Sequence, residues 1–276
     1  MILVTGATGN VGSALVRQLA DGHVPVRALV RDPARAKLPD AAEPYTGDLN
    51  EPDTLKAGLD GVDGVFLLAG YDDLPVTLDL MRQAGVKRVV LLSGGAATSS
   101  NRDNPITRYQ TASEADVQGS GLSWTILRPS GFMTNTMQWA EQLKAGDRVR
   151  APFADVRVAN IDPYDIAAVA ARALTSDGHD GQTYRLTGPQ SLLPSDRAQI
   201  LGEALGRDLG FEAQPHDEAY AEMAAAMPVE YANAFFSFYQ DGTLDESPVS
   251  DAVPRVLDRP GRTFAHWCRE NAGAFA

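Results

Sequence analysis

Short apolar runs alternate with amphipathic stretches along the first half of the chain. Val, Ile and Leu dominate five runs that predict buried strands, at residues 2–5, 26–30, 64–68, 89–92 and 124–128. The stretches at 53–59, 74–84 and 112–118 have the spacing of helices. Strands that are apolar on both faces are typical of a parallel sheet that helices cover on both sides. The pattern therefore predicts an α/β fold with a Rossmann-type, doubly wound parallel sheet.

Three glycines stand at three-residue spacing directly after the first predicted strand. Gly6 allows a sharp turn, Gly9 lets a pyrophosphate approach the backbone, and Gly12 lets the following helix lie close to the strand. Unpaired N–H groups and the dipole at the start of that helix attract anions. Val11 begins an apolar helical stripe and a second strand follows, so the turn lies in the βαβ unit that a dinucleotide site requires. A glycine-rich turn without a ligand is the alternative interpretation.

The pattern changes after residue 150 and predicts a second, smaller part of the molecule. Further elements are a strand at 183–186 and helices at 162–174, 195–205, 217–238 and 263–271. Pro228 is expected to break the third of these helices. We therefore predict a nucleotide-binding domain over residues 1–150, to which 156–188 return, and a smaller, mainly helical substrate-binding region over 189–276.

The end of the second predicted strand decides which dinucleotide fits. An acidic side chain there would hydrogen-bond the ribose hydroxyls of NAD, but the chain has Arg31. A guanidinium suits the 2′-phosphate of NADP in charge and geometry, and Arg35 and Lys37 follow one turn later. Asp32 would favour NAD if the register shifted by one residue, and Arg31 would otherwise be a solvated surface charge. The placement predicts NADP(H) in preference to NAD(H).

Composition narrows the setting in which the protein works. The 276 residues carry a formal net charge of −12 and no block of Lys or Arg, which disfavours nucleic acid as a partner. A single cysteine, Cys268, excludes an internal disulfide. The chain begins with a predicted strand rather than with a signal segment. No apolar run approaches the roughly 18 residues that span a bilayer. We expect a cytoplasmic protein that acts on a small molecule, binds no membrane and is compatible with a homodimer. The four histidines are scattered without ligand spacing, so no metal site is predicted.

Several segments occur in an order that is more specific than the glycine turn alone. They are GATGNVG from Gly6, ALVRDPARA from Ala28, GDL from Gly47, SGLSWTILRPSGFMTN from Ser120, and IDPYDIAAVAARAL with TYRLTGPQ from Ile161. In this order they resemble the NmrA-like family of atypical short-chain dehydrogenase/reductases. The likeness begins at the first strand and becomes loose after Leu209.

The resemblance implies where a cofactor and a substrate would bind. Gly6, Thr8, Gly9, Asn10, Val11 and Gly12 would hold the pyrophosphate, with Arg31 at the 2′-phosphate. Asp48 and Leu49 would contact the adenine, and Ala69, Gly70 and Ser93 would line the ribose and the nicotinamide. The turn of Pro129, Ser130 and Phe132 would close over the nicotinamide. Phe132 and Met133 would face a substrate, in a pocket that Trp139 completes.

The chain departs from ordinary short-chain dehydrogenases in the residues that move a proton. Those enzymes lower the pKa of a catalytic tyrosine with a lysine four residues later. Ser113 stands at that distance from Tyr109, and Gln110 corresponds to the lysine that many NmrA-like reductases carry in this helix. Ser93 would either orient a substrate or form the turn at a strand end. The candidate catalytic residues are thus Ser93, Tyr109 and Gln110, and reduction of an ordinary carbonyl is not favoured.

Two functions of different classes fit these residues. The first is an NADPH-dependent reductase of a quinone, an azo compound or a similar soft electrophile, to which hydride is transferred directly while water supplies the proton. The second, which the resemblance also implies, is a non-catalytic NADP(H)-binding sensor that reports to a protein partner. An apolar stripe at 220–239 is either core or the wall of a substrate pocket. We favour the reductase.

Overall fold

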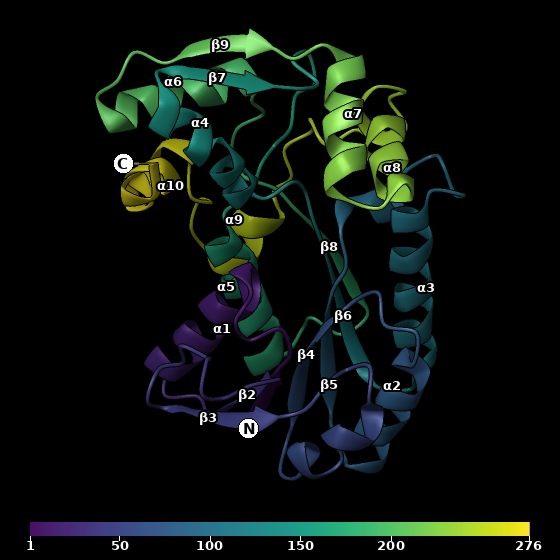
Figure 1. Cartoon of the computed structure of the whole chain (residues 1–276). Coiled ribbons are helices and arrows are strands. Elements are labelled where there is room, and N and C mark those ends of the chain that lie inside the picture. The colour runs from purple at the N-terminus through teal and green to yellow at the C-terminus, as the bar shows by residue number, and fades with distance from the viewer. Residues whose placement is uncertain (276) are drawn as a thin grey trace. The chain divides into compact units, whose positions relative to one another are not determined.

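A computed structural model describes residues 1–275 and consists of two compact units (Figure 1). The sheet unit comprises residues 1–94, 109–129 and 163–185, and the helical unit comprises 95–108, 130–162 and the chain from 186 onward. The chain therefore passes between the two units repeatedly. Residues 163–185 return to the sheet unit, whereas 95–108 and 130–150 of the predicted nucleotide-binding domain lie in the helical unit.

The sheet unit is built on a seven-stranded sheet in the order β3-β2-β1-β4-β5-β6-β8. Its strands are β1 (Ile2–Val4), β2 (Val26–Val30), β3 (Ala42–Thr46), β4 (Gly64–Leu68), β5 (Arg88–Leu92), β6 (Ser123–Pro129) and β8 (Gln182–Leu186). The first six pair in parallel, and Ile2 is in register with both Val26 and Gly64. The strand order reverses between β1 and β4, the switch point at which such sheets bind ligands. The predicted doubly wound sheet is confirmed.

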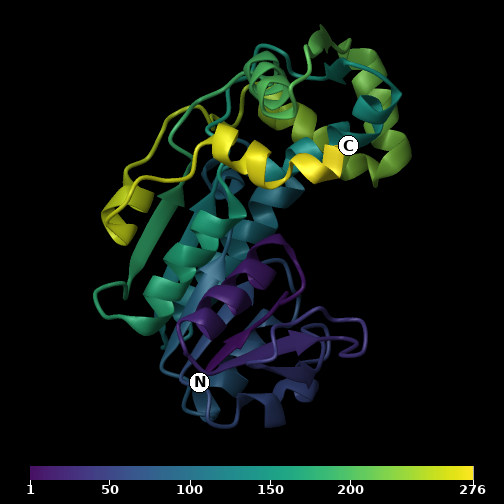
Figure 2. The same cartoon turned by 90° about the vertical axis from the view of Figure 1, so that its left-hand side faces the viewer.

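Helices cover both faces of this sheet. α1 (Asn10–Asp21) and α5 (Pro163–Thr175) lie side by side on one face, while α2 (Leu74–Gln83) and most of α3 (Pro105–Gly119) cover the other (Figures 1 and 2). Alternation along β4 explains the two layers. Val65 and Leu67 join the buried cluster that contains Leu78 of α2, whereas Phe66 between them points to the opposite face. The strands are apolar on both faces because both faces are covered.

Most predicted elements of the sheet unit begin and end within one or two residues of their expected limits, with three exceptions. Edge strand β3 is not predicted, because its sequence Ala-Glu-Pro-Tyr-Thr is polar and contains a proline, which only an edge strand tolerates. The helix predicted at 53–59 is wrong, since two short 3₁₀ helices, Pro52–Leu55 and Ala57–Leu59, take its place. α3 begins at Pro105 rather than at 112, and it ends at Gly119 as predicted.

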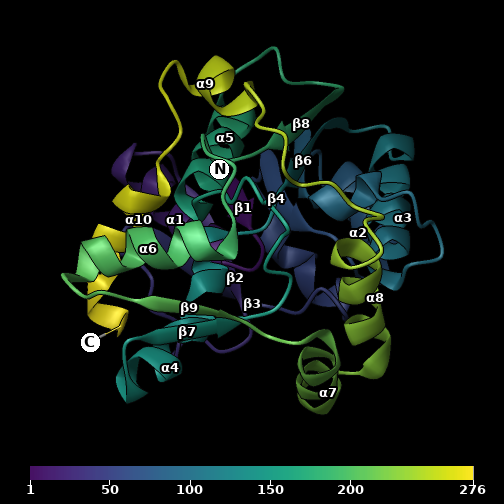
Figure 3. The same cartoon turned by 90° about the horizontal axis from the view of Figure 1, so that it is seen from above.

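The helical unit combines short helices with a small sheet. Its α-helices are α4 (Ala140–Ala145), α6 (Pro194–Leu205), α7 (His216–Ala226), α8 (Val229–Tyr239), α9 (Ala252–Leu257) and α10 (Phe264–Glu270). β7 (Arg148–Ala151) and β9 (Gly210–Ala213) pair in parallel beside α6 (Figure 3). α7 and α8 join at Pro228, which confirms the predicted break. None of the helices within residues 1–275 is long and apolar enough to cross a membrane.

The core of the helical unit is rich in aromatic side chains. Phe264 and Trp267 of α10 stack with their ring centroids 5.7 Å apart, and Trp139 is buried in the same cluster. Cys268 also lies there, and burial raises the pKa of its thiol to about 12. The thiol therefore stays protonated at neutral pH and serves as a core residue.

Candidate functional site

The turn after β1 is shaped by contacts that only glycine permits. Gly6 has φ +59°, and a Cβ at this position would lie 2.7 Å from Cδ1 of Leu68 in β4. A Cβ at Gly12 would collide with the carbonyl oxygen of Gly6, so α1 starts directly against the turn. The Gly9 N–H donates to that same carbonyl at 2.9 Å and closes the turn. These contacts agree with the roles that the glycine spacing predicts.

Helix α1 begins without a side-chain cap. Gly9 is its N-cap residue in an extended conformation, and no acidic side chain occupies the first turn of the helix. The first N–H groups of α1 are therefore open to an anion, with no carboxylate of the helix competing for them. Thr8, Gly9 and Asn10 are exposed, whereas Val11 and Gly12 are buried beneath them. The turn therefore has the open backbone that the predicted pyrophosphate site requires at Gly9.

Arg31 and Asp32 follow β2 in different environments. Oδ1 of Asp32 accepts the Ala34 N–H at 3.0 Å, so this carboxylate closes a local turn. Arg31 is exposed, and its guanidinium has no ion-pair or hydrogen-bond partner within residues 1–275. Arg35 and Lys37 are exposed as well. The Arg31 guanidinium is therefore available to a ligand at the end of β2, whereas one oxygen of Asp32 is already hydrogen-bonded to the backbone.

Asp48 and Leu49 form a rigid turn after β3. Oδ1 of Asp48 accepts the backbone N–H and the side-chain amide of Asn50, each at 2.9 Å, and the Asp48 N–H donates to Thr54 at 3.0 Å. Leu49 is buried in the core cluster of the sheet unit. Of the two predicted adenine contacts, Leu49 therefore offers backbone atoms rather than an exposed side chain.

The loop after β4 is tied to α3 by a serine. Oγ of Ser113 accepts the Gly70 N–H at 3.1 Å and donates to the Tyr109 carbonyl at 2.8 Å. Ser113 stands four residues after Tyr109, where a short-chain dehydrogenase would have its lysine. Its hydroxyl thus links the backbone of α3 to the loop after β4. The Tyr109 ring lies against Gly70 and is 37% exposed. The predicted contacts Ala69 and Gly70 consequently lie beside the predicted catalytic tyrosine.

Ser93 belongs to a buried hydrogen-bonded group that the sequence does not reveal. Its Oγ donates to Oε1 of Glu114 at 2.6 Å, and Nε of Arg128 donates to the same oxygen at 2.9 Å. A second hydrogen bond from Arg128 reaches the other oxygen of Glu114, and these bonds raise the pKa of the Arg128 guanidinium. Because its proton is engaged, Ser93 can accept a hydrogen bond from a bound group but has none left to donate.

Gln110 is the neutral residue where the resemblance implies a lysine. It is 8% exposed and packs so closely against Gly94 that a Cβ there would overlap its Nε2. Its Oε1 is buried and has no hydrogen-bond partner within residues 1–275. An amide carries no charge, so Gln110 cannot stabilise a tyrosinate as a lysine would.

The chain after β6 departs from the predicted pocket. Pro129 ends β6, and Ser130 begins a segment of the helical unit, where its N–H donates to Leu186 at 2.9 Å and its Oγ to Ala159 at 2.5 Å. Phe132 is partly exposed, but Met133 and Trp139 are each 1% exposed and join the core around Leu201 and Phe264. The 3₁₀ helix Met133–Trp139 turns these two side chains inward, so they are core residues rather than walls of an open pocket.

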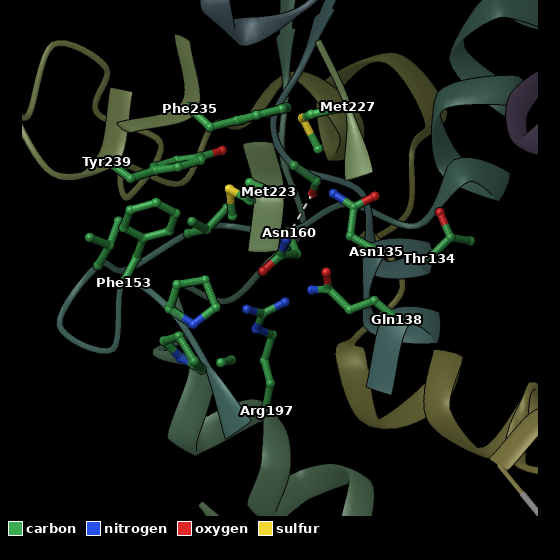
Figure 4. A pocket seen from close by; sticks show the side chains of 16 residues that line it. Thr134, Asn135, Gln138, Phe153, Asn160, Arg197, Met223, Met227, Phe235 and Tyr239 are labelled. Carbon is green, nitrogen blue, oxygen red and sulfur yellow. Dashed lines mark hydrogen bonds between the residues drawn. The ribbon is translucent and has the colours of Figure 1, made fainter. Parts of the chain in front are cut away.

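A cavity of about 520 Å³ lies within the helical unit (Figure 4). It is lined on one side by the apolar residues Phe153, Val156, Met223, Met227, Phe235 and Tyr239, and on the other by Thr134, Asn135, Gln138, Asn160 and Arg197. The apolar stripe at 220–239 therefore divides between two roles. Met223, Met227, Phe235 and Tyr239 face the cavity, whereas Phe238 is buried beside Ala234 in the core.

Two of the four histidines make structural contacts. His179 shares a hydrogen bond of 2.8 Å with the Tyr184 hydroxyl, and the ring of His216 lies 5.9 Å from that of Phe153. Burial lowers the pKa of His179. Among residues 1–275, no group of three or more His, Cys, Asp or Glu side chains is placed to hold a metal ion.

A doubly wound sheet with a glycine turn at its switch point defines a dinucleotide-binding protein. The chain belongs to the NAD(P)H-binding family, whose model matches residues 6–177. Over 287 residues it is 39% identical to the NAD(P)H azoreductase of Xenophilus azovorans, covering 100% of this chain and 99% of that protein. It is also 39% identical over 282 residues to the (4-alkanoyl-5-oxo-2,5-dihydrofuran-3-yl)methyl phosphate reductase of Streptomyces griseus, covering 100% and 99% of the two chains. The structure of Citrobacter sp. triphenylmethane reductase complexed with NADP(H) is similar at a TM-score of 0.82 and 23% identity, covering 99% of this chain and 100% of that one.

The buried ion pair gives a prediction about stability. Glu114→Gln leaves the partly buried Arg128 without its carboxylate, and we expect a loss of about 3 kcal/mol in the free energy of unfolding, because an uncompensated cation remains. Urea denaturation followed by circular dichroism measures the change. Glu141→Gln removes an exposed carboxylate that pairs with Lys144 and should cost less than about 1 kcal/mol. Equal losses in the two variants would show that the Glu114 pair is not a brace.

The glycine turn gives a prediction about cofactor binding. Gly9 has φ −82°, which a valine adopts, and its Cβ would lie 3.3 Å from the carbonyl oxygen of Gly6, so Gly9→Val should fold after a small shift of the turn. Its side chain would fill the space of the pyrophosphate, and we expect the affinity for both NADPH and NADH to fall by roughly 100-fold or more. Isothermal titration calorimetry measures both affinities. Gly119→Val is the matched control, because no atom lies near a Cβ at that position. Retained binding in Gly9→Val would refute the site.

Proposed function

We propose that the protein is an NADPH-dependent reductase that delivers a hydride directly to a soft electrophile such as an azo compound or a quinone. Membership of the NAD(P)H-binding family and the full-length likeness to an NAD(P)H azoreductase support an NAD(P)H-dependent reductase. The relative from Streptomyces griseus is named as a reductase of a furanone phosphate ester, so equally similar proteins use different acceptors. The acceptor and the mechanism are therefore argued from the residues of this chain.

The proposal rests on the neutral residues Ser113 and Gln110, which stand where related enzymes have a lysine. Ser113 bonds the backbone of Tyr109 and Gly70, and Gln110 is a buried neutral amide, so no cation stands beside Tyr109 from either position. A phenol without such a cation is a poor proton donor to a developing alkoxide. A quinone needs less help, because the electron pair that hydride addition displaces settles on a phenolate oxygen, which is far less basic than an alkoxide. In an aromatic azo compound the aryl rings share the charge of the nitrogen anion until water protonates it.

The nicotinamide of NADPH supplies the hydride when it is bound. In an azo acceptor the hydride forms an N–H bond, the N=N π bond breaks, and the second nitrogen takes a proton from water to give a hydrazo compound. In a quinone the same two electrons and one proton give a hydroquinone. The turn at Gly6–Gly12 would position the dinucleotide, and the Tyr109 side chain, which is 37% exposed, would act at most as a hydrogen-bond donor to the acceptor.

We further infer that NADPH is preferred over NADH. Arg31 is exposed and has no partner within residues 1–275, whereas Oδ1 of Asp32 accepts the Ala34 N–H. A 2′-phosphate would give the guanidinium a partner, while a ribose diol would gain nothing from it. This difference favours NADP as the ligand of the β2 end.

A non-catalytic NADP(H) sensor is the alternative function. Such a protein needs a surface for its partner but no cavity for a second small molecule. The open cavity of about 520 Å³ in the helical unit, with its aromatic lining, favours the reductase, since ligand sites of this size and character suit flat aromatic molecules.

Turnover tests the proposal directly. Purified protein should oxidise NADPH in the presence of a quinone such as menadione or an azo dye such as methyl red, followed by absorbance against a blank without protein. Tyr109→Phe should retain the rate within about threefold, whereas loss of a true general acid costs about 100-fold or more. Tight binding of NADPH without turnover of any acceptor would favour the sensor. A large loss in Tyr109→Phe would contradict the direct mechanism.

Reversal of the charge at Arg31 tests the cofactor preference. Arg31→Asp should weaken NADPH by roughly 100-fold and change NADH by less than about threefold, because only NADPH has the phosphate that the guanidinium contacts. KM values for the two cofactors measure the split. Lys56→Asp changes the net charge equally at an exposed residue and should affect neither cofactor. Equal losses for both cofactors in Arg31→Asp would refute the assignment.

A further inference from the structure

One cation faces the cavity of the helical unit. Arg197, in the first turns of α6, is the single charged residue among those that line it. Figure 4 shows its guanidinium pointing into the cavity beside Gln138, with the aromatic ring of Tyr239 across the space. The cavity therefore combines an apolar wall with a positive charge at one end.

The guanidinium of Arg197 has no anionic partner in the protein. Within residues 1–275 no carboxylate lies within ion-pair distance, no acceptor receives its N–H groups, and its Nε is buried and unpartnered. Other arginines of the helical unit differ, because Arg150 pairs with Glu212 and Arg207 with Asp147. Burial lowers the pKa of Arg197 to about 10, so it is still a cation at neutral pH.

The ring contact of Arg197 leaves its charge and its N–H donors without a partner among residues 1–275. Its Cζ lies 5.1 Å from the centroid of the buried Trp139 ring, a cation–π contact. An indole ring provides neither an anion nor a lone-pair acceptor, so the guanidinium keeps its charge and its N–H donors for a ligand. Trp139 therefore supports Arg197 without neutralising it.

The nearest acidic groups are engaged elsewhere. Glu246 accepts the Tyr239 hydroxyl through Oε2 at 2.8 Å, so this carboxylate is bonded to a wall of the cavity rather than to Arg197. Asp196, the neighbour of Arg197 in α6, accepts the Leu193 N–H at 3.0 Å and pairs with Arg157 at 3.3 Å. Neither carboxylate neutralises Arg197, so the charge remains available to a ligand.

The opposite wall of the cavity is held in a strained conformation. Phe153 has φ +55°, which a bulky side chain seldom adopts and which costs of the order of 1 kcal/mol or more. Its ring packs edge-on against Phe236 with a centroid distance of 5.1 Å and lies 5.3 Å from Tyr239. Strain of this kind is common where a wall must take a set position for a ligand.

We propose that Arg197 is an anion subsite that binds a carboxylate, sulfonate or phosphate group of the substrate, whose aromatic body lies against Phe153 and Phe235. The proposal rests on the reductase function and adds that the preferred electron acceptors are anionic. A guanidinium with a free edge binds an oxyanion through two parallel hydrogen bonds. The bound anion would also compensate the charge of a cation that faces an apolar wall. Binding would thereby offset the loss of stability that an unpaired buried arginine causes.

Three dyes that differ in one group test the charge requirement. Methyl orange has one sulfonate, methyl red has one carboxylate, and dimethylaminoazobenzene is their neutral parent. We expect kcat/KM of the protein with NADPH to be higher for the two anionic dyes. Arg197→Met should lower it by roughly 100-fold for these dyes and by less than about threefold for the neutral parent. Arg197→Lys should recover part of the loss, because it keeps the charge without the guanidinium edge.

Controls separate the subsite from a structural role. Arg148→Met removes one positive charge from an exposed position in β7 and should leave all three dyes unchanged. The melting temperature of Arg197→Met shows whether its fold is intact. Equal losses for the neutral and anionic dyes in Arg197→Met, or no preference for anionic dyes in the unaltered protein, would overturn the subsite.

A binding measurement keeps the subsite separate from catalysis. Naphthalenesulfonate should bind the unaltered protein in isothermal titration calorimetry and bind Arg197→Met roughly 100-fold more weakly, whereas the neutral analogue naphthol should bind both alike. Binding of this kind without turnover of any dye would support the subsite and refute the reductase. Turnover of all dyes with no effect of Arg197→Met on either measurement would support the reductase and overturn the subsite.

Discussion

The approach of α1 to the turn after β1 constrains the cofactor end of the sheet unit more than any other contact. No side chain at Gly12 could fit beside the carbonyl oxygen of Gly6, and Gly6 in turn leaves no room for a Cβ beside Leu68 of β4. The turn is thus held between the start of α1 and the end of β4. The start of α1 and its positive dipole end are held in place by backbone packing before any ligand binds, so a pyrophosphate need not order them.

Helix α3 acts as a brace where related enzymes would have an acid. Ser113 ties it to the loop after β4, and Glu114 ties it to Ser93 at the end of β5 and to Arg128 in β6. These bonds use the polar groups that could otherwise move protons. Ser93, Ser113 and Glu114 are thereby engaged in holding the fold, which agrees with the proposal that the acceptor needs little more than a positioned hydride.

The sequence predicts those parts of the molecule that depend on local spacing. The parallel sheet follows from apolar runs, the tight turn from Gly6 and Gly12, and the break between α7 and α8 from Pro228. The Glu114 pair with Arg128 is harder to find, because the two residues are far enough apart in the chain that only the fold joins them. One local signal is present: Glu114 lies on the same helical face as the apolar Val117, where a lone carboxylate needs a buried partner. Met133 and Trp139 are predicted as pocket residues but lie in the core, because apolar side chains in a short 3₁₀ helix fit a core and a pocket equally well and only packing decides between them.

The route of the chain places the cavity and the glycine turn in different units. The segments of the helical unit leave the sheet unit after β5, β6 and β8, at the carboxyl end of each strand. All residues that line the cavity, Arg197 and Phe153 included, belong to these segments. All residues of the glycine turn and the β2 end belong to the sheet unit. If the cavity binds the acceptor as proposed, substitutions there can change which acceptor fits while the packing of Gly6 and Gly12, which lie in the other unit, stays as it is.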